Sequence, residues 1–312
     1  MKTFKPASSF KSSSKTVVTI GTFDGVHLGH RKIINRLNKV AESKGLESTL
    51  LTFFPHPRMV LQQKQDLKLI NTIDERIEFL SKTGLQNLII EPFTLEFSRL
   101  TAEEYVEQFL VDYLKAAVVI VGYDHRFGRN RKADIRDLRR FAKTYDFEVV
   151  EISKQDIDDV AVSSTKIRKA IAEGEIDKAN TFLTKPFTLS GQVVKGKQLG
   201  KSLGYPTANL HVEEDYKIIP KEGSYVVRSN INGETYFGMM NIGQNPTVNQ
   251  SNHKFIETYF FDFDQNLYGQ NLQIDLLKRI RDEKKFDSLD ALKEAMKADE
   301  DYSRQYIKKH VE

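Results

Sequence analysis

Residues 21–30 read Gly-Thr-Phe-Asp-Gly-Val-His-Leu-Gly-His, and this stretch decides the fold prediction. Residues 16–20 just before it, Thr-Val-Val-Thr-Ile, are β-branched and predict a buried strand. After it, apolar residues recur at helical spacing from Ile33 to Ala41, and Gly45 marks the expected end of a helix. The stretch is therefore predicted to be a turn that leads from a strand into a helix.

This predicted turn has the composition of a phosphate-binding site. Its glycines, Gly21, Gly25 and Gly29, let the backbone turn tightly and approach a ligand. A helix start offers unpaired N–H groups and a positive dipole end, and His27 and His30 are further donors to phosphate. Two alternatives stay open from these residues alone: a tight turn with two surface histidines, or a His-x-x-His metal pair. The chain has no cysteine and no third ligand near this pair, which weakens the metal alternative.

The composition predicts a globular protein of two domains. The chain has 312 residues, 39% of them hydrophobic, and a formal net charge of +4 at pH 7. This mild basicity suits an anionic ligand as well as nucleic acid. The absence of cysteine excludes disulfides and thiolate chemistry. The Ser- and Lys-rich start lacks the apolar core of a secretory signal, and no apolar run approaches a membrane span, so we expect a soluble, cytoplasmic protein.

Alternating strand and helix patterns predict an α/β fold for the first two-thirds of the chain, with a parallel sheet covered on both faces. Further strands are expected over residues 48–54, 88–90, 117–121 and 147–152. Helices are expected to start at capping boxes in residues 72–75, running to Gly84, and 101–104, and to cover residues 135–145. Ligands in such folds bind beyond the carboxyl ends of the strands, so the residues that follow strands are the informative ones.

Three later stretches carry candidate ligand residues. Residues 54–58, Phe-Pro-His-Pro-Arg, predict either a rigid turn or a wall of a flavin or nucleotide site. Residues 122–131 follow an expected strand and are rich in arginine, which suits phosphate. Residues 163–168, Ser-Ser-Thr-Lys-Ile-Arg, predict the start of a helix that ends at Gly174. Its Ser and Thr residues are either ordinary caps or phosphate ligands, with Arg168 one turn into the helix.

The periodicity changes after Lys185, where short alternating segments replace the helical spacing. The dipeptide at residues 232–233, Asn-Gly, predicts a hairpin turn. We therefore expect a small β-barrel closed by a helix from about Ser288, and a division into domains 1–184 and 185–312.

Residues 196–209 of this second domain read Gly-Lys-Gln-Leu-Gly-Lys-Ser-Leu-Gly-Tyr-Pro-Thr-Ala-Asn. They do not form a P-loop, because three residues rather than four separate Gly196 from Gly200 and no helix is expected to follow. Thr207 and Asn209 point to one face of an extended chain, and their neutral oxygens suit Mg²⁺.

Residues 255–264 read Phe-Ile-Glu-Thr-Tyr-Phe-Phe-Asp-Phe-Asp and predict a strand. Alternation places Asp262 and Asp264 on one face and Glu257 on the other, together with Phe255, Tyr259, Phe261 and Phe263. A carboxylate on an aromatic face is costly unless it is paired or used. Glu257 is therefore either an edge residue that reaches solvent or a functional group.

In this order, the stretches resemble the motifs of bacterial bifunctional riboflavin kinase/FMN adenylyltransferases, the FAD synthetases. Residues 21–30 resemble the nucleotide-binding signature of the nucleotidyltransferase superfamily, and residues 122–134 and 163–168 resemble the second and third motifs of this family. In the second motif His125 replaces the usual aromatic residue, and Ala133 stands where glycine is common. Residues 196–209 and 255–264 resemble the riboflavin kinase signature.

The resemblance implies a Rossmann-like nucleotidyltransferase domain followed by a β-barrel riboflavin kinase domain. It implies that riboflavin is phosphorylated to FMN and FMN is adenylylated to FAD, with ATP as co-substrate, Mg²⁺ as cofactor and release of pyrophosphate. Glu257 would be the kinase base, and His27, His30 and Arg168 would hold the phosphates of ATP. The other implied ATP or phosphate contacts are Gly21, Phe23, Asp24, Gly25, Gly29, Asp124, Arg126, Ser163, Ser164, Thr165, Gly196, Lys197, Lys201 and Gly204. Implied flavin contacts are Phe54, Pro55 and Tyr259, and implied metal ligands are Thr207 and Asn209.

Two alternative functions remain at this point. One is a nucleotidyltransferase with a single activity on another phosphate acceptor, and the other is a catalytically silent flavin-binding or nucleic-acid-binding regulator. No RNA-recognition signature appears in the chain. We expect small-molecule substrates, no nucleic-acid or membrane partner, and a monomer or weak homo-oligomer.

Overall fold

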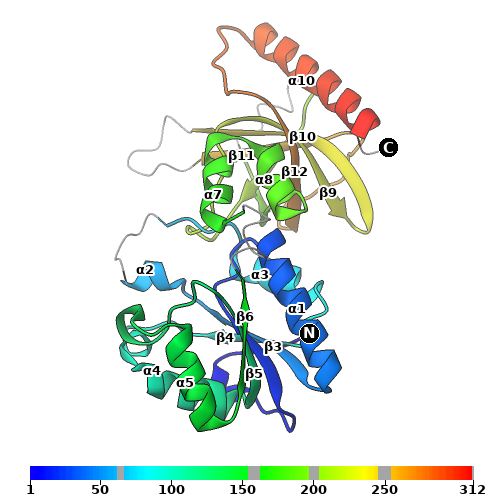
Figure 1. Cartoon of the computed structure of the whole chain (residues 1–312). Helices are drawn as coiled ribbons and strands as arrows, with labels where there is room; N and C mark the ends of the chain where they lie inside the picture. Colours follow the sequence, from blue (N-terminus) through cyan, green and yellow to red (C-terminus); the bar gives the residue numbers. More distant parts are fainter. Residues whose placement is uncertain (62–66, 154–161, 197–203, 245–253, 311–312) are drawn as a thin grey trace. The chain divides into compact units, whose positions relative to one another are not determined.

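The computed structural model describes residues 1–61, 67–153, 162–196, 204–244 and 254–310 (Figure 1). By its internal contacts the chain divides into two compact units. Unit 1 comprises Met1–Leu67 and Asn71–Ser164, and unit 2 comprises Lys68–Ile70 and Thr165–Glu312. The candidate residues Lys197 and Lys201 lie outside the described residues.

Unit 1 is an α/β unit built around one sheet. Its strands are β1 (Lys2–Phe4), β2 (Thr16–Ile20), β3 (Glu47–Phe53), β4 (Asn87–Glu91), β5 (Ala116–Gly122) and β6 (Glu148–Ile152). Its helices are α1 (Leu28–Lys44), α2 (Pro57–Leu61), α3 (Ile73–Ser81), α4 (Ala102–Tyr105), the π-helix η3 (Val106–Tyr113) and α5 (Ile135–Tyr145), with short 3₁₀ turns η1 (Ala7–Ser9), η2 (Phe97–Arg99) and η4 (Arg129–Arg131). Both predicted capping boxes are present at the starts of α3 and α4, although α3 ends before the expected Gly84.

The sheet has the strand order β1-β4-β3-β2-β5-β6, and all neighbouring strands are parallel, as predicted. From β2 the chain moves outward to β3 and β4 on one side and later returns to β5 and β6 on the other. This reversal makes the carboxyl ends of β2 and β5 the topological switch point, where open α/β sheets bind ligands. The loops that follow Ile20 and Gly122 start there, and they carry the first and second motifs.

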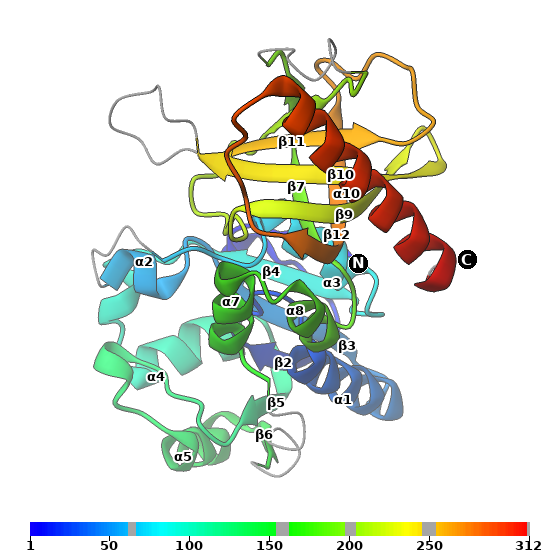
Figure 2. The same ribbon diagram turned by 90° about the horizontal axis from the view of Figure 1, so that it is seen from above.

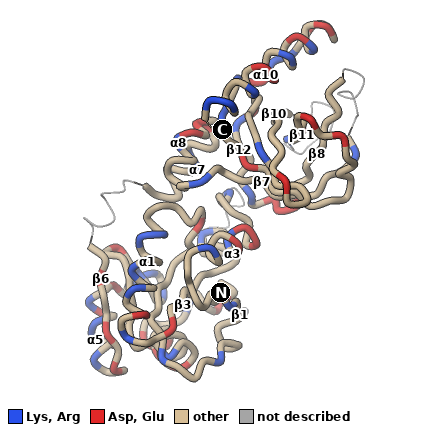
Figure 3. The backbone as a smooth tube through the Cα atoms, turned by 90° about the vertical axis from the view of Figure 1, so that its right-hand side faces the viewer, with Lys and Arg blue, Asp and Glu red and all other residues tan. Residues whose placement is uncertain are grey.

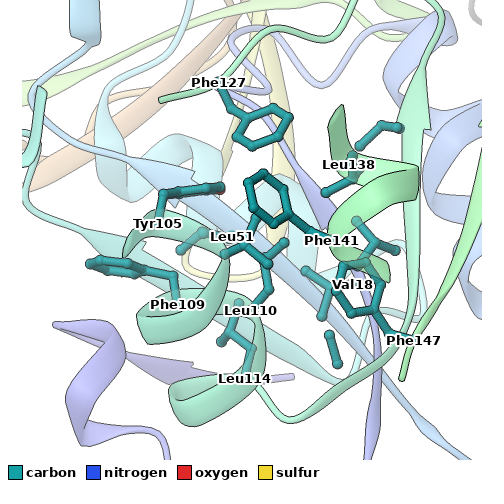
Figure 4. Packing of buried hydrophobic residues seen from close by; sticks show 14 of the residues in the cluster. Val18, Leu51, Tyr105, Phe109, Leu110, Leu114, Phe127, Leu138, Phe141 and Phe147 are labelled. Carbon is teal, nitrogen blue, oxygen red and sulfur yellow. The ribbon is translucent and has the colours of Figure 1, made fainter. Parts of the chain in front are cut away.

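Helices cover both faces of the sheet (Figure 1). On one face Val18 and Leu51 pack against residues of α4, η3 and α5 in the cluster that Figure 4 shows. On the other face Val17 and Leu50 pack against α1 and α3. Because successive strand residues point to opposite faces and both faces are covered, the central strands β2 and β5 are buried along almost their whole length.

The amino-terminal segment is part of the sheet, which the sequence analysis did not predict. Strand β1 pairs with β4 and forms one edge of the sheet. Phe4 lies edge to face with the buried Phe10, with ring centroids 5.0 Å apart, and the N–H of Ala7 donates to Glu91 at 2.6 Å. A few apolar residues among many serines and lysines are therefore enough to fix this segment.

In its described residues, unit 2 is a closed barrel accompanied by helices. Its elements are α7 (Ser164–Glu173), α8 (Ile176–Leu183), β7 (Phe187–Val194), β8 (Ala208–His211), β9 (Gly223–Ile231), β10 (Glu234–Gln244), β11 (Lys254–Phe260), β12 (Asn271–Arg281) and α10 (Leu289–His310). The barrel has the antiparallel order β10-β11-β8-β7-β12-β9. Asn232 and Gly233 have φ of 54° and 90° and form the predicted two-residue hairpin turn.

Helix α10 lies across the outside of the barrel and contacts β10 and β12. Figure 2 shows it crossing β10. Two bidentate ion pairs hold the helix. Arg281 of β12 donates to Asp299 at 2.9 and 2.8 Å, and Arg304 donates to Asp262, just beyond β11, at 2.9 and 3.2 Å. The planar guanidinium matches a carboxylate in this geometry, so the pairs also fix the orientation of the helix.

The alternation predicted for residues 255–264 holds only as far as the strand does. Ile256, Thr258 and Phe260 are buried, whereas Phe255, Glu257 and Tyr259 are half-buried on the other face, as predicted. The prediction is wrong for Phe263, because β11 ends at Phe260 and Asp262 turns the chain with a φ of 54°. Phe263 packs against Phe260 and Tyr236 instead.

Helices α7 and α8 group with the barrel, apart from Ser164. The buried face of α8 packs on β12 and β7. The Asn180 side chain fixes this contact, because it donates to the carbonyl of Leu276 at 2.9 Å and accepts from the N–H of Phe187 at 2.7 Å. The predicted division of the two activities at residues 184/185 stays a prediction.

A buried lysine attaches residues 68–70 to the barrel within unit 2. Leu69 pairs with Lys217 in a parallel bridge, and only 2% of Lys217 is exposed. The Lys217 ammonium donates to the carbonyls of Ile70 and Thr188 at 2.8 and 2.7 Å and lies 4.6 Å from the centre of the Phe187 ring. A buried cation needs such partners, since burial removes its hydration.

We predict that Lys217→Met destabilises unit 2. Methionine keeps the apolar stem but removes the donor to two buried carbonyls, at a cost of about 1–3 kcal/mol for each. Urea unfolding of the full chain followed by circular dichroism measures the loss. The control is Lys221→Met, which removes an exposed pair with Asp282 (3.0 Å) and should cost at most about 1 kcal/mol. Equal stability of the two variants would contradict this account.

Candidate active sites

The turn between β2 and α1 is held in a strained conformation by burial. Phe23 and Val26 have φ of 47° and 43°, a region that side chains with a Cβ rarely adopt, and Gly25 between them has a φ of 93°. Each such residue costs on the order of 1–3 kcal/mol. Phe23 and Val26 are 2% and 0% exposed in the core beside α1, and full burial of such side chains contributes about 1.5–3 kcal/mol each. Burial therefore offsets the strain and fixes the turn.

This turn positions the two predicted phosphate-binding histidines. His27 is the N-cap of α1, where its Nδ1 accepts a hydrogen bond from the N–H of His30 at 3.4 Å. The two rings stack with centroids 3.6 Å apart. Gly29 makes room for this stack, because a Cβ there would lie 3.3 Å from the His27 ring. His27 is buried, so the alternative of two surface histidines is wrong.

The same contacts bear on the metal alternative. His27 already uses Nδ1 as a cap acceptor. Among the residues that the structure describes, no group of three or more His, Asp or Glu side chains could hold a metal ion.

The His30 imidazole lies in a positive and desolvated environment. Burial lowers the pKa of His30 well below its ordinary value of 6.5, and His27 and Arg76 lower it further. The ring is therefore neutral at pH 7. In the described part of the chain no group hydrogen-bonds its buried Nδ1. A neutral ring beside a cation is a donor that suits an arriving phosphate.

Arg76 of α3 is a residue that the sequence analysis missed. It is 0% exposed, and its Nη1 donates to the Thr52 hydroxyl at 3.5 Å. That hydroxyl donates in turn to the carbonyl of Thr22 at 3.2 Å. The guanidinium therefore holds the turn through Thr52, which binds the carbonyl of Thr22. It also adds a positive charge near His30. Its only sequence signal was its place one turn into a capped helix.

The first and third motifs meet within unit 1. Asp24 is 0% exposed, and its carboxylate accepts from the N–H of Asn71 at 3.2 Å. Its carbonyl accepts from the Ser164 hydroxyl at 2.9 Å. Ser163 is exposed, and Thr165 and Arg168 follow Ser164 in α7 as members of unit 2. The predicted contact of Arg168 with ATP stays a prediction.

The loop after β5 explains the two departures from the second motif. His125 stacks on Phe127 with centroids 5.8 Å apart, and burial lowers the pKa of His125 to about 4. It is therefore neutral at pH 7 and takes the place of an aromatic ring. Ala133 is buried and exchanges backbone hydrogen bonds of 3.1 and 3.3 Å with Phe127. Asp124 and Arg126 are exposed, and Arg126 lies 3.6 Å from Asp134.

The candidate flavin residues Phe54 and Pro55 follow β3 and are joined by a cis peptide. Phe54 is partly buried against the α1 and α3 face, whereas Pro55 is exposed. The next residue, His56, accepts from the N–H of Arg58 at 3.1 Å and so begins α2, which the sequence analysis did not predict. A contact of Phe54 with flavin stays a prediction.

The second candidate site is a row of polar side chains on three neighbouring strands of the barrel. Glu257 of β11 is the register partner of Asn209 of β8 and, on its other side, of Asn241 of β10. Such partners have Cβ atoms about 4.5–5.5 Å apart, so the carboxylate lies between two amides. All three residues are half-buried and face away from the barrel core. The sequence analysis missed Asn241, because only strand pairing brings it to Glu257.

Two contacts connect the segments before β8 with this row. Gly196 lies against Asn209, since a Cβ on Gly196 would be 2.2 Å from the Asn209 Nδ2 atom. Thr207 precedes β8 and is half-buried. Gly204 has a φ of 86°, and Tyr205 after it lies edge to face with Tyr259, at 5.0 Å between centroids. The Glu257 carboxylate therefore lies near amide oxygens, and the aromatic ring of Tyr259 lies on the same face of β11.

The chain matches two family models, one described as FAD synthetase over residues 9–166 and one described as riboflavin kinase over residues 183–307. The bifunctional riboflavin kinase/FMN adenylyltransferase of Listeria monocytogenes is 37% identical over 294 residues, which cover 94% of this chain and 93% of the relative. The protein of the same name from Bacillus subtilis is 33% identical over 302 residues, which cover 95% and 94%.

A solved structure also matches the whole chain. It is titled as the crystal structure of a macrolide-efflux protein from Streptococcus pneumoniae and has a TM-score of 0.86 at 32% identity, covering 97% of this chain and 98% of that one. Its title names an activity different from that of the family models and curated relatives, so the match supports the fold. In the described part of the chain, no helix has the length and apolar character needed to cross a membrane.

We predict that His125→Phe makes unit 1 less sensitive to acid. As pH falls from 6.5 toward 4, the unfolded chain protonates this histidine while the folded chain does not, so the parent loses stability. The limit is about 1.4 kcal/mol per pH unit for one group. Urea unfolding at neutral pH and at about pH 5 measures the difference. Parent and variant that lose equal stability between these conditions would show that His125 is not held neutral.

Proposed function

The chain belongs to the family of bifunctional riboflavin kinase/FMN adenylyltransferases, and from this premise we propose which of its residues carry each reaction. The enzyme phosphorylates riboflavin with ATP to give FMN. It then joins the AMP part of a second ATP to FMN, which gives FAD and pyrophosphate. The observation that carries this function is that both family models match, one after the other, within one chain.

For adenylyl transfer we assign the phosphate site to the β2–α1 turn. A phosphate oxygen of FMN attacks the α-phosphorus of ATP, and the bond to the β-phosphate breaks to release pyrophosphate. The nucleophile comes from the substrate, so the protein supplies alignment and donors. The start of α1 and the imidazoles of His27 and His30 are those donors, and Arg76 adds a positive charge behind them. The Ser164 hydroxyl binds the Asp24 carbonyl of the same turn, and Gly21 leaves room for the Phe23 ring.

We predict that His30→Ala lowers the conversion of FMN to FAD by about 10²–10³-fold, the usual effect of removing one positioned donor. Phosphorylation of riboflavin should be unchanged, which serves as the folding control. His30→Gln, which keeps an N–H donor, should recover part of the loss. Chromatographic separation of the flavins after incubation with ATP and Mg²⁺ measures both activities. A His30→Ala variant that makes FAD at the parent rate would remove His30 from the phosphate site.

For the kinase reaction we assign the row at Asn209 and Glu257. The Glu257 carboxylate accepts the proton of the riboflavin 5′-hydroxyl as that oxygen attacks the γ-phosphorus of ATP, and ADP leaves. Asn241 flanks the carboxylate and limits its orientation. Thr207 and Asn209 offer neutral oxygens beside it, which fits Mg²⁺ bound mainly through substrate phosphates. The bound ion would neutralise phosphate charge.

We predict that Glu257→Gln lowers kinase turnover by about 10²–10⁴-fold, because the amide keeps the shape but not the proton-accepting charge. The KM for riboflavin should change little, and FMN adenylylation should not change. Asp264→Asn is the matched control, since Asp264 is exposed and lies beyond β11. Asp262 is unsuitable as a control because it accepts hydrogen bonds from Arg304 of α10. Parent-like turnover of Glu257→Gln would make Glu257 a structural residue.

We further propose that the two activities divide near residue 185. Because α7 and α8 group with the barrel, a kinase fragment that keeps them should be more stable than one that begins at Lys185. We expect the enzyme to work in the cytoplasm as a monomer or weak homo-oligomer, without a nucleic-acid partner. Because one family model matches each part of the chain, the matches favour two activities over a single-activity transferase or a silent regulator.

A further inference from the structure

Glu300 of α10 is a mostly buried carboxylate of unit 2. Figure 3 shows charged residues of both signs along this helix. The side chain of Glu300 is 13% exposed, whereas that of the next residue, Asp301, is 53% exposed. A carboxylate that has lost most of its hydration needs hydrogen-bond donors. The contacts of Glu300 therefore show what this part of α10 holds in place.

Both oxygens of Glu300 have donors. The Oε2 atom accepts from the Tyr205 hydroxyl at 3.3 Å, and the Oε1 atom accepts from the Arg304 Nε at 2.9 Å. The two Nη atoms of Arg304 donate to Asp262 at 2.9 and 3.2 Å, and the guanidinium lies 4.6 Å from the centre of the buried Phe261 ring. One polar network thus joins the segment before β8 and the segment after β11 to α10.

The Tyr205 end of this network lies beside the kinase row. Tyr205 precedes Thr207 by two residues, and its ring lies edge to face with Tyr259 at 5.0 Å between centroids. Tyr259 follows Glu257 on the same face of β11. Burial raises the pKa of Tyr205, and Glu300 raises it further, so the hydroxyl stays protonated and donates. Glu300 therefore fixes the hydroxyl of Tyr205, while β11 fixes its ring.

We propose that Glu300 is a positioning residue for the kinase reaction and acts through Tyr205. The inference rests on the proposed assignment of Thr207 and Asn209 to the kinase site. Pro206 has a fixed φ, so a displacement of Tyr205 is passed on to Thr207. Phosphoryl transfer depends mainly on alignment, and a small displacement therefore lowers turnover more than it lowers the affinity for riboflavin.

Two conservative variants test this link. Tyr205→Phe keeps the ring and removes the hydroxyl, and Glu300→Gln keeps the size and replaces one acceptor oxygen by a donor. We expect each variant to lower kinase kcat by about tenfold and to change the KM for riboflavin by less than about twofold. The double variant should lose about as much as the larger single loss, because both changes break the same link. The matched control is Tyr236→Phe, which removes another Tyr–Glu hydrogen bond, of 2.7 Å, and should keep the parent kcat.

Hydrogen exchange of the free protein, followed by mass spectrometry, gives a readout independent of turnover. Tyr205→Phe and Glu300→Gln should increase exchange in peptides that cover residues 204–211 and leave β9 and β12 unchanged. Tyr236→Phe should not change exchange at 204–211. The proposal fails if neither of the two test variants changes exchange there, if their kcat stays at the parent value, or if the KM for riboflavin rises as much as kcat falls.

Thr207→Ala separates this proposal from the function on which it rests. If Thr207→Ala keeps the parent kcat, Thr207 has no part in the kinase site, and both the assignment and the role of Glu300 are wrong. If Thr207→Ala loses turnover and Tyr205→Phe does not, the assignment stands and only the role of Glu300 is wrong. We expect both variants to lose turnover, with the larger loss in Thr207→Ala.

Discussion

The strained turn between β2 and α1 is the constraint on which unit 1 depends. Burial of Phe23 and Val26 holds the backbone in a conformation that it would otherwise leave. That conformation makes His27 the cap of α1, and the cap and stack then fix His30. The same burial desolvates His30 and keeps it neutral, so packing sets both the geometry and the charge state of the proposed phosphate site.

In unit 2 the corresponding constraint is the register of the barrel strands. Closing the barrel sets β8, β11 and β10 side by side, and the register then places Glu257 between Asn209 and Asn241. The ion pairs Arg281–Asp299 and Arg304–Asp262 hold α10 over the outside of this barrel. Glu257, Asn209 and Asn241 all belong to unit 2, and the topology of that unit brings them together.

Local signals predicted most of the fold. The capping boxes at residues 72–75 and 101–104, the Asn232–Gly233 turn and the range of α5 all agree with the structure. The sequence did not predict β1, α2 and α8, because segments of three, five and eight residues are too short to show a clear strand or helix period. It also missed Arg76 and Asn241, because tertiary packing and strand pairing bring them to the sites. Alternation failed at Phe263, where a positive φ at Asp262 ends the pattern.

The central claim is that one chain holds two chemically independent sites joined by diffusible FMN. The most direct test mixes two inactive partners, His30→Ala and Glu257→Gln, with riboflavin, ATP and Mg²⁺, and follows FAD by chromatography. We predict that neither variant alone makes FAD at an appreciable rate and that the mixture does, because the first supplies FMN to the second. A mixture that makes no more FAD than either variant alone would contradict the account.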